Sequence, residues 1–211
     1  MDDVMERYRA LINKVVDRKQ SLKRLIQFLE TRTAWLTAPA SDRYHLCREK
    51  GLLEHSVGVT ETLLKVSRCL LEGIISDESI VIVGLFHDVG KSACNLSTGP
   101  EPYYIPNPSA YLSKIRSIPY TTNPNMVAMG TAMRSLYIIN KFLSLTDTEA
   151  QAIAYHDGGA LAGYLSIVRR ETPLTLLLHF SDGWHAAMHE ENRPIDMSQD
   201  YFYGILDPLQ K

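Results

Sequence analysis

The chain has 211 residues, of which 45% are apolar and 22% are charged, and this fits one globular domain with a sizeable core. Its 22 basic and 24 acidic residues give a formal net charge of −2, which argues against a broad electrostatic grip on nucleic acid or anionic lipid. The three cysteines are widely spaced, and the sequence shows neither a secretory leader nor an apolar run of membrane-spanning length. These features predict a cytoplasmic protein without a disulfide framework and without a membrane partner.

The first half of the chain is predicted to be helical. Apolar residues recur every three or four positions over residues 4–35, which indicates an amphipathic helical segment. A second helix is predicted over about residues 52–72, with Gly73 as its C-terminal cap. A short apolar helix follows over residues 78–90, with Asp77 as its N-cap.

The second half adds helices over residues 126–143 and 147–157, and a last helix that starts at Pro173 and runs to about residue 190. Because no segment shows sustained alternation of period two, the predicted fold class is all-α. Residues 92–125 are the exception, since they hold six of the ten prolines and four tyrosines. A long non-periodic segment of this kind is typical of a lid or binding loop, and a solvated connector with packed tyrosines is the alternative.

An imidazole and a carboxylate stand side by side at the end of the short apolar helix, in His87 and Asp88. A buried carboxylate needs a partner, and a divalent cation is one that satisfies both side chains at once. Lys91 follows three residues after Asp88, on the same side of a helix. A lysine beside a metal suits a phosphate-handling site, and the alternative is that Lys91 only neutralises Asp88.

Three segments together resemble the H…HD…D signature of the HD-domain superfamily of metal-dependent phosphohydrolases. They are GLLEHSV at 51–57, FHDVGK at 86–91 and LLHFSD at 177–182. The region before the first motif, with His45 ten residues ahead of His55, is similar to the HD domain of YhaM-type 3′–5′ exoribonucleases. Small HD hydrolases that act on nucleotides share the same core.

The resemblance covers roughly residues 36–190 and implies an HD-type helical bundle in which the Pro/Tyr-rich loop is an insertion. Residues 1–35 are then expected to form a helical segment packed on this domain, and residues 191–211 a C-terminal tail.

The resemblance also implies one divalent ion, held by His55, His87, Asp88 and Asp182. Two imidazoles and two carboxylates suit Mn, Fe, Co, Ni or Zn, and Mg less well, so the identity of the metal is open. Such an ion acidifies a bound water, which becomes the nucleophile, while Lys91 offsets the charge on the phosphoryl oxygens.

Members of the superfamily with two metals carry further histidines between the HD pair and the final aspartate. In this sequence His156 is the candidate for such a position, so a full dinuclear site is not expected. His156 could contact phosphate, donate a proton or cap its helix. The predicted catalytic residues are Asp88, Lys91 and His156.

The predicted substrate-binding residues are Lys91, Arg134, His45 and Tyr104. Arg134 could bind phosphate in a bidentate way or be a surface charge. His45 could stack on a base or belong to the core, and Tyr104 lies in the loop that is expected to close over the substrate. His179 is a candidate for orienting Asp182, with a packed core histidine as the alternative.

The leading functional prediction is hydrolysis of a phosphoester or phosphoanhydride bond in a nucleotide, such as a deoxynucleoside mono- or triphosphate. One alternative is a 3′–5′ exonuclease on single-stranded RNA or DNA, although only about 35 residues precede the HD region to hold a strand. Another is a non-catalytic HD protein that binds a nucleotide or a metal. A small nucleotide is the expected partner, nucleic acid is less favoured, and self-association is open.

Overall fold

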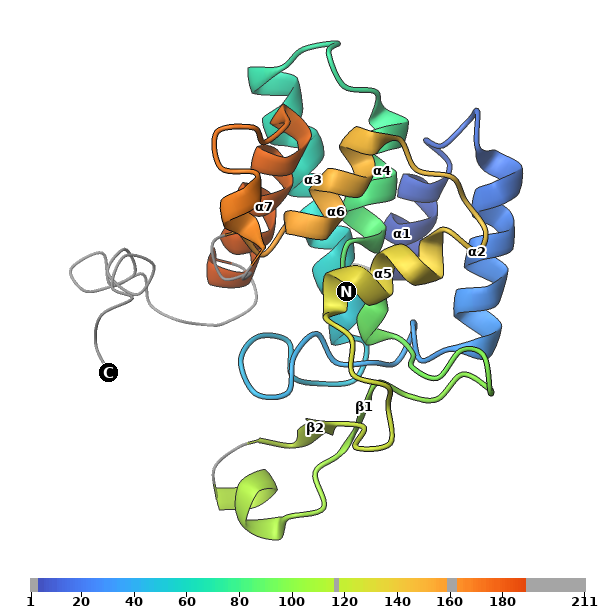
Figure 1. Ribbon diagram of the computed structural model, residues 1–211, viewed down its shortest axis with the longest axis vertical. Helices are drawn as coiled ribbons and strands as arrows, with labels where there is room; N and C mark the ends of the chain where they lie inside the picture. The colour runs from blue at the N-terminus through green and yellow to red at the C-terminus, as the bar shows by residue number, and fades with distance from the viewer. Residues whose placement is uncertain (1–3, 116–117, 159–162, 189–211) are drawn as a thin grey trace, which may run out of the picture.

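The computed structural model describes residues 4–115, 118–158 and 163–188, which are mainly helical (Figure 1). The α-helices are α1 (Val4–Ile12), α2 (Lys19–Arg32), α3 (Gly51–Leu70), α4 (Asp77–Phe86), α5 (Thr131–Ile139), α6 (Asp147–Tyr155) and α7 (Pro173–Met188). The shorter elements are 3-10 turns at Val89–Lys91 and Tyr164–Ser166, a π-helical turn at Tyr111–Ile115, and the strands β1 (Tyr104–Pro106) and β2 (Tyr120–Thr122).

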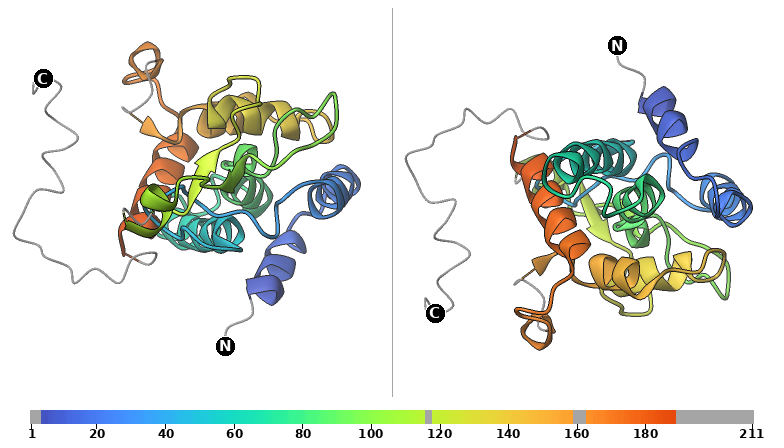
Figure 2. Two further views of the ribbon diagram at one scale, coloured as in Figure 1. Left: turned by 90° about the horizontal axis from the view of Figure 1, so that it is seen from below. Right: turned by 90° about the horizontal axis from the view of Figure 1, so that it is seen from above.

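Helices α3 and α4 form the centre of the bundle, and the other helices pack around them (Figures 1 and 2). Every residue from Ile80 to Phe86 of α4 is buried, because this helix is apolar on all faces. Helix α3 contacts α1, α4 and α7, so its apolar side chains join one continuous core. Among the described helices, none combines the length and the apolar content that crossing a membrane requires.

The N-terminal helical segment is interrupted between α1 and α2. Residues 13–18 form turns, and the backbone N–H groups of Val16 and Asp17 donate to the carboxylate of Glu78 at 2.9 and 2.8 Å. This carboxylate lies in the first turn of α4, so a residue about sixty positions away satisfies the interrupted backbone. The amphipathic pattern of residues 4–35 does not reveal the break.

Helix α4 differs from its predicted bounds at both ends. Its N-cap is Ser76, whose hydroxyl accepts a hydrogen bond from the N–H of Ser79 at 3.1 Å, and Asp77 is the first helical residue. The helix ends at Phe86, and a 3-10 turn starts at Val89. His87 and Asp88 therefore lie in the break between two helical pieces, where neighbouring side chains can converge more easily than on a regular helix.

The Pro/Tyr-rich segment departs from the all-α prediction. Strands β1 and β2 pair antiparallel, with Tyr104 opposite Thr122 and Pro106 opposite Tyr120, and the hairpin projects from one end of the bundle (Figure 1). Tyr, Ile and Thr favour strands. Strands of three residues are too short to produce a detectable alternation in the sequence.

Candidate metal centre

Three helices, α3, α4 and α7, bring the predicted metal ligands together. His55 lies on α3, His87 is the C-cap residue of α4, Asp88 follows it, and Asp182 lies on α7. Because α3 packs against both α4 and α7, residues separated by more than a hundred positions meet at the centre of the bundle. His55, His87 and Asp88 are almost completely buried, and the side chain of Asp182 is 19% exposed.

The ligand atoms of these residues converge closely. His55 Nε2 lies 3.2 Å from His87 Nε2 and 3.0 Å from Asp182 Oδ1. The Oδ2 atom of Asp88 lies 3.8 Å from His55 Nε2 and 3.7 Å from His87 Nε2. For metal–ligand bonds of about 2.1 Å, adjacent ligands around one ion lie roughly 3.0–3.4 Å apart, with wider separations at larger bond angles. Among these residues, the ligand atoms of His55, His87 and Asp182 all lie within 4.8 Å of one another, and Asp88 adjoins this group through His55 and His87.

The histidine side chains are oriented by the backbone. His87 Nδ1 donates to the carbonyl oxygen of Gly84 at 2.8 Å, and His156 Nδ1 donates to that of Ile153 at 2.8 Å. Since a carbonyl can only accept, the proton of each neutral ring is held on Nδ1 and the Nε2 lone pair is directed into the cluster. Fixing the tautomer through the second ring nitrogen is the usual way in which a protein prepares a histidine ligand.

Neighbouring basic groups lower the pKa values of the two carboxylates in the cluster. Burial raises the pKa of Asp88, but the nearby Lys91 and His87 lower it further, so the net pKa is well below its ordinary value. Burial also raises the pKa of Asp182, and contacts with His55 and His87 bring it well below the ordinary range. Both carboxylates are therefore anionic at neutral pH, as a cation site requires.

Lys91 pairs directly with Asp88. Its Nζ lies 2.5 Å from Asp88 Oδ2, and the lysine side chain is 17% exposed. Burial lowers the pKa of Lys91, but Asp88 raises it above the ordinary value, so the ammonium keeps its charge. The pairing is compatible both with neutralisation of Asp88 and with a role toward a bound anion.

His156 and Asp157 extend the set of donors. His156 Nε2 lies 3.5 Å from Asp88 Oδ1 and 3.5 Å from Asp157 Oδ1. Burial lowers the pKa of His156, but its interaction with Asp88 raises it to about 9. Three overlapping groups of potential ligands result, each with its atoms within 4.8 Å: His55, His87 and Asp182; His87, Asp88 and His156; His156, Asp157 and Asp182.

These buried His/Asp groups could hold a metal ion. No ligand role was predicted for Asp157, because the run Asp-Gly-Gly after a helix resembles an ordinary helix stop. The signal that could have identified it is its position next to His156.

Two predicted substrate-binding residues lie close to the cluster. Tyr104 on β1 is near enough to Lys91 and Asp88 to interact with them electrostatically. Burial raises its pKa above the ordinary value, so the hydroxyl keeps its proton. The ring of His45 lies 5.2 Å from that of His55, between centroids. The hairpin and the segment before α3 thus both reach the candidate metal centre.

Arg134 is directed into the Pro/Tyr-rich segment. It is only 3% exposed, and its Nη2 donates to the carbonyl oxygens of Val127 at 2.9 Å and Met129 at 3.4 Å. Its guanidinium also lies 5.6 Å from the centre of the Tyr103 ring. These contacts join α5 to the base of the hairpin, and phosphate binding by Arg134 stays a prediction.

Two further histidines on α7 pack against glycines. His179 Nδ1 donates to the carbonyl oxygen of His156 at 2.6 Å, so it contacts the turn that carries His156. A Cβ on Gly158, whose φ is +59°, would lie 2.5 Å from the His179 ring. A Cβ on Gly58 would lie 1.7 Å from His185 Nε2, so α3 can approach α7 only with glycine there. His185 and His189 are four residues apart, a spacing that can bind zinc on a helix, but His189 lies outside the described residues.

A scan against protein-family models found no match for the chain, and searches of curated proteins and of solved structures found none. The interpretation of the site therefore depends on its own geometry and on the sequence motifs that predicted it.

Proposed function

We propose that the chain is an HD-type metal-dependent phosphohydrolase that cleaves a phosphoester or phosphoanhydride bond of a nucleotide. One observation carries this proposal. The four side chains of the H…HD…D pattern are His55 on α3, His87 and Asp88 at the end of α4, and Asp182 on α7, and they meet in a buried cluster with contacts of 3.0–3.8 Å. Chance matches to a short motif give no reason for such convergence.

The donor set fits a divalent cation. Two imidazole nitrogens, of which that of His87 has its tautomer fixed by Gly84, and two anionic carboxylates are typical ligands of first-row metals. When bound, such a cation lowers the pKa of a water ligand and polarises a phosphoryl oxygen. Within this proposal, His55, His87, Asp88 and Asp182 are the residues that hold it.

The surrounding residues have defined roles in the proposed reaction. The ammonium of Lys91, 2.5 Å from Asp88, is placed beside the ligands, where it can stabilise negative charge on a phosphoryl group. His156, whose Nε2 lies 3.5 Å from the other carboxylate oxygen of Asp88, is the candidate to donate a proton to the leaving oxygen. Tyr104 of the hairpin interacts electrostatically with Lys91 and Asp88, and within this proposal it contributes to substrate binding.

The decisive experiment combines metal content with turnover. Chelator-treated protein is reloaded with Mn²⁺, Co²⁺, Zn²⁺ or Mg²⁺ and assayed on nucleoside mono-, di- and triphosphates and on labelled single strands. The assay measures phosphate, pyrophosphate and triphosphate. We expect about one bound metal per chain and metal-dependent cleavage of a free nucleotide.

His87→Ala and Asp88→Asn should abolish metal uptake and turnover, while the exposed control Asp147→Asn should keep both. The circular dichroism of all three variants should remain helical. Full activity in His87→Ala would refute the metal site. Metal binding without any turnover would show a non-catalytic metal-binding protein, and cleavage of strands alone would show an exonuclease.

A further inference from the structure

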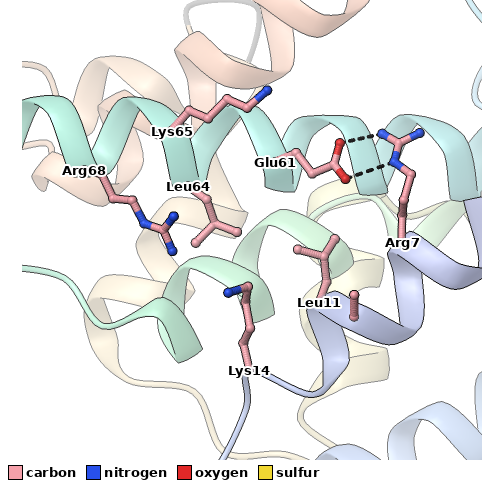
Figure 3. Close-up of a pocket in the computed structure, with 8 residues that line it drawn as sticks. Arg7, Leu11, Lys14, Glu61, Leu64, Lys65 and Arg68 are labelled. Carbon is pink, nitrogen blue, oxygen red and sulfur yellow. Dashed lines mark hydrogen bonds and ion pairs between the residues drawn. The ribbon is translucent and has the colours of Figure 1, made fainter.

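Apart from the candidate metal centre, a cleft with a volume of about 490 Å³ lies between α1 and the C-terminal half of α3 (Figure 3). Leu11 and Leu64 form its apolar floor. Figure 3 shows the Arg7–Glu61 pair at one end of the cleft and Arg68 at the other. A volume of this size falls in the range of sites for small organic ligands.

The lining of the cleft carries a surplus of positive charge. Arg7 is neutralised by Glu61, to which its Nε donates at 2.9 Å. Arg68 and Lys14 share one carboxylate oxygen, Oδ2 of Asp77, at 2.9 and 3.7 Å.

Lys65 adds another cation to the lining, and it forms no hydrogen bond or ion pair within the part of the chain that the structure describes. The lining holds four cations, and the two carboxylates that pair with them, Glu61 and Asp77, leave a local charge of +2. The cations are Arg7, Lys14, Lys65 and Arg68. The chain as a whole has a formal net charge of −2.

We infer that this cleft binds a small organic phosphomonoester, an activity separate from the proposed hydrolysis. A phosphomonoester carries a charge of about −1.5 to −2 at pH 7, which matches the local surplus. Figure 3 shows the guanidinium of Arg68 directed into the cleft, where it suits paired hydrogen bonds to phosphate oxygens, and Lys65 adds positive charge at the rim. Leu11 and Leu64 offer apolar contact to the organic part of the ligand.

The cleft is distinct from the candidate metal centre. His55 and Arg68 lie on the same helix, thirteen residues apart, which corresponds to about 20 Å along the helix axis. A ligand in the cleft would therefore not contact the metal ligands. A nucleic acid strand is the less favoured occupant, because an ion pair closes one end of the cleft and the chain as a whole is slightly acidic.

The test uses phenyl phosphate as the probe and the full chain in EDTA, so that metal-dependent binding and hydrolysis are excluded. Calorimetry at low ionic strength should detect saturable binding of phenyl phosphate and weaker binding of the monoanion phenyl sulfate. Lys65→Gln/Arg68→Gln should weaken the binding of phenyl phosphate by about tenfold, because the charge-assisted contact of Arg68 and the nearby charge of Lys65 are lost. The control Lys23→Gln/Arg24→Gln removes the same charge from exposed positions on α2 and should change affinity by less than about twofold.

Equal weakening in both double variants would show nonspecific charge attraction and overturn the proposal. Unchanged affinity in both, or the absence of binding to the wild-type chain, would overturn it as well. A decathymidylate strand serves as the last comparison. If the affinity for the strand falls in Lys65→Gln/Arg68→Gln but phenyl phosphate does not bind, the surface is a nucleic-acid contact and the small-ligand proposal is wrong.

Discussion

Lys91 has two candidate roles, which are to neutralise Asp88 and to stabilise negative charge on a bound phosphoryl group. Its ammonium contacts Asp88 at 2.5 Å in a nearly buried setting. In the proposed function, a bound cation supplies charge compensation for Asp88, and the lysine acts on the phosphoryl group. The two roles make different predictions for the metal content of a Lys91 variant.

We expect Lys91→Ala to reduce kcat of the metal-loaded protein by about 10²–10³-fold, the usual effect of removing one group that stabilises transition-state charge. The metal content should stay near one per chain, measured by elemental analysis after gel filtration. Lys91→Arg should keep the charge and part of the activity. If Lys91→Ala instead loses its metal or unfolds, the lysine serves mainly to neutralise Asp88.

The proximity of single residues was predictable from the sequence where a motif carried it. The four predicted ligands are His55, His87, Asp88 and Asp182, and the structure gives contacts of 3.0–3.8 Å among them, whereas metal binding by these residues stays a prediction. The direction of a side chain was not predictable. Arg134 was expected to bind phosphate or to be a surface charge, and its guanidinium is buried against the carbonyls of Val127 and Met129. These residues lie in the irregular stretch 126–130, which was predicted to be part of the helix. The surface alternative is therefore wrong, and phosphate binding stays a prediction.

At the scale of elements, local signals predicted helices well and their ends less well. Pro173 starts α7 as expected, whereas α3 ends at Leu70 with Leu71 as its C-cap, so Gly73, which has a left-handed φ of +73°, is not the cap that was predicted. The break between α1 and α2 and the end of α4 at Phe86 were not predicted. The first depends on the carboxylate of Glu78 from another helix, and no propensity within residues 13–18 contains that information.

The hairpin is the element with the clearest dependence on one side chain. Arg134 holds residues 127 and 129 through their carbonyls and lies over Tyr103, which precedes β1. We expect Arg134→Met to speed hydrogen exchange of the β1 and β2 amides by about tenfold or more, since losing about 1.4 kcal/mol of local stability has this effect.

Amides in the middle of α3 serve as the internal reference and should exchange at the wild-type rate. A uniform acceleration across the molecule would mean that Arg134 stabilises the whole fold. Unchanged exchange in the hairpin would mean that the strands are held without it.

At the scale of the whole molecule, Arg18 connects three parts of the chain. It lies between α1 and α2 and pairs with Glu78 of α4 at 2.6 Å and with Glu149 of α6 at 2.6 Å. The side chain of Glu149 is completely buried. Glu149 also forms a capping box with Thr146, so the same carboxylate starts α6 and fixes the N-terminal helices to the core.

Burial raises the pKa of Glu149, but the hydrogen bond from Arg18 lowers it further, so the net folded-state pKa lies below its ordinary value of 4.5. A carboxylate with a depressed folded-state pKa stabilises the protein above its unfolded-state pKa, and this contribution is lost as the pH falls through the folded-state pKa. We therefore expect the free energy of unfolding of the wild-type chain to decrease progressively below about pH 4.5.

Arg18→Met should lower the free energy of unfolding at pH 7 by about 3–5 kcal/mol, because it leaves a buried carboxylate without its partner. Urea denaturation measures this change. The deficit should shrink as the pH is lowered, since protonation removes the uncompensated charge of Glu149. Arg18→Met/Glu149→Met should recover much of the lost stability and should lack that pH dependence. A deficit that is equally large at pH 4 and pH 7 would show that Arg18 acts through packing of its aliphatic chain, and that its charge does not hold the helices together.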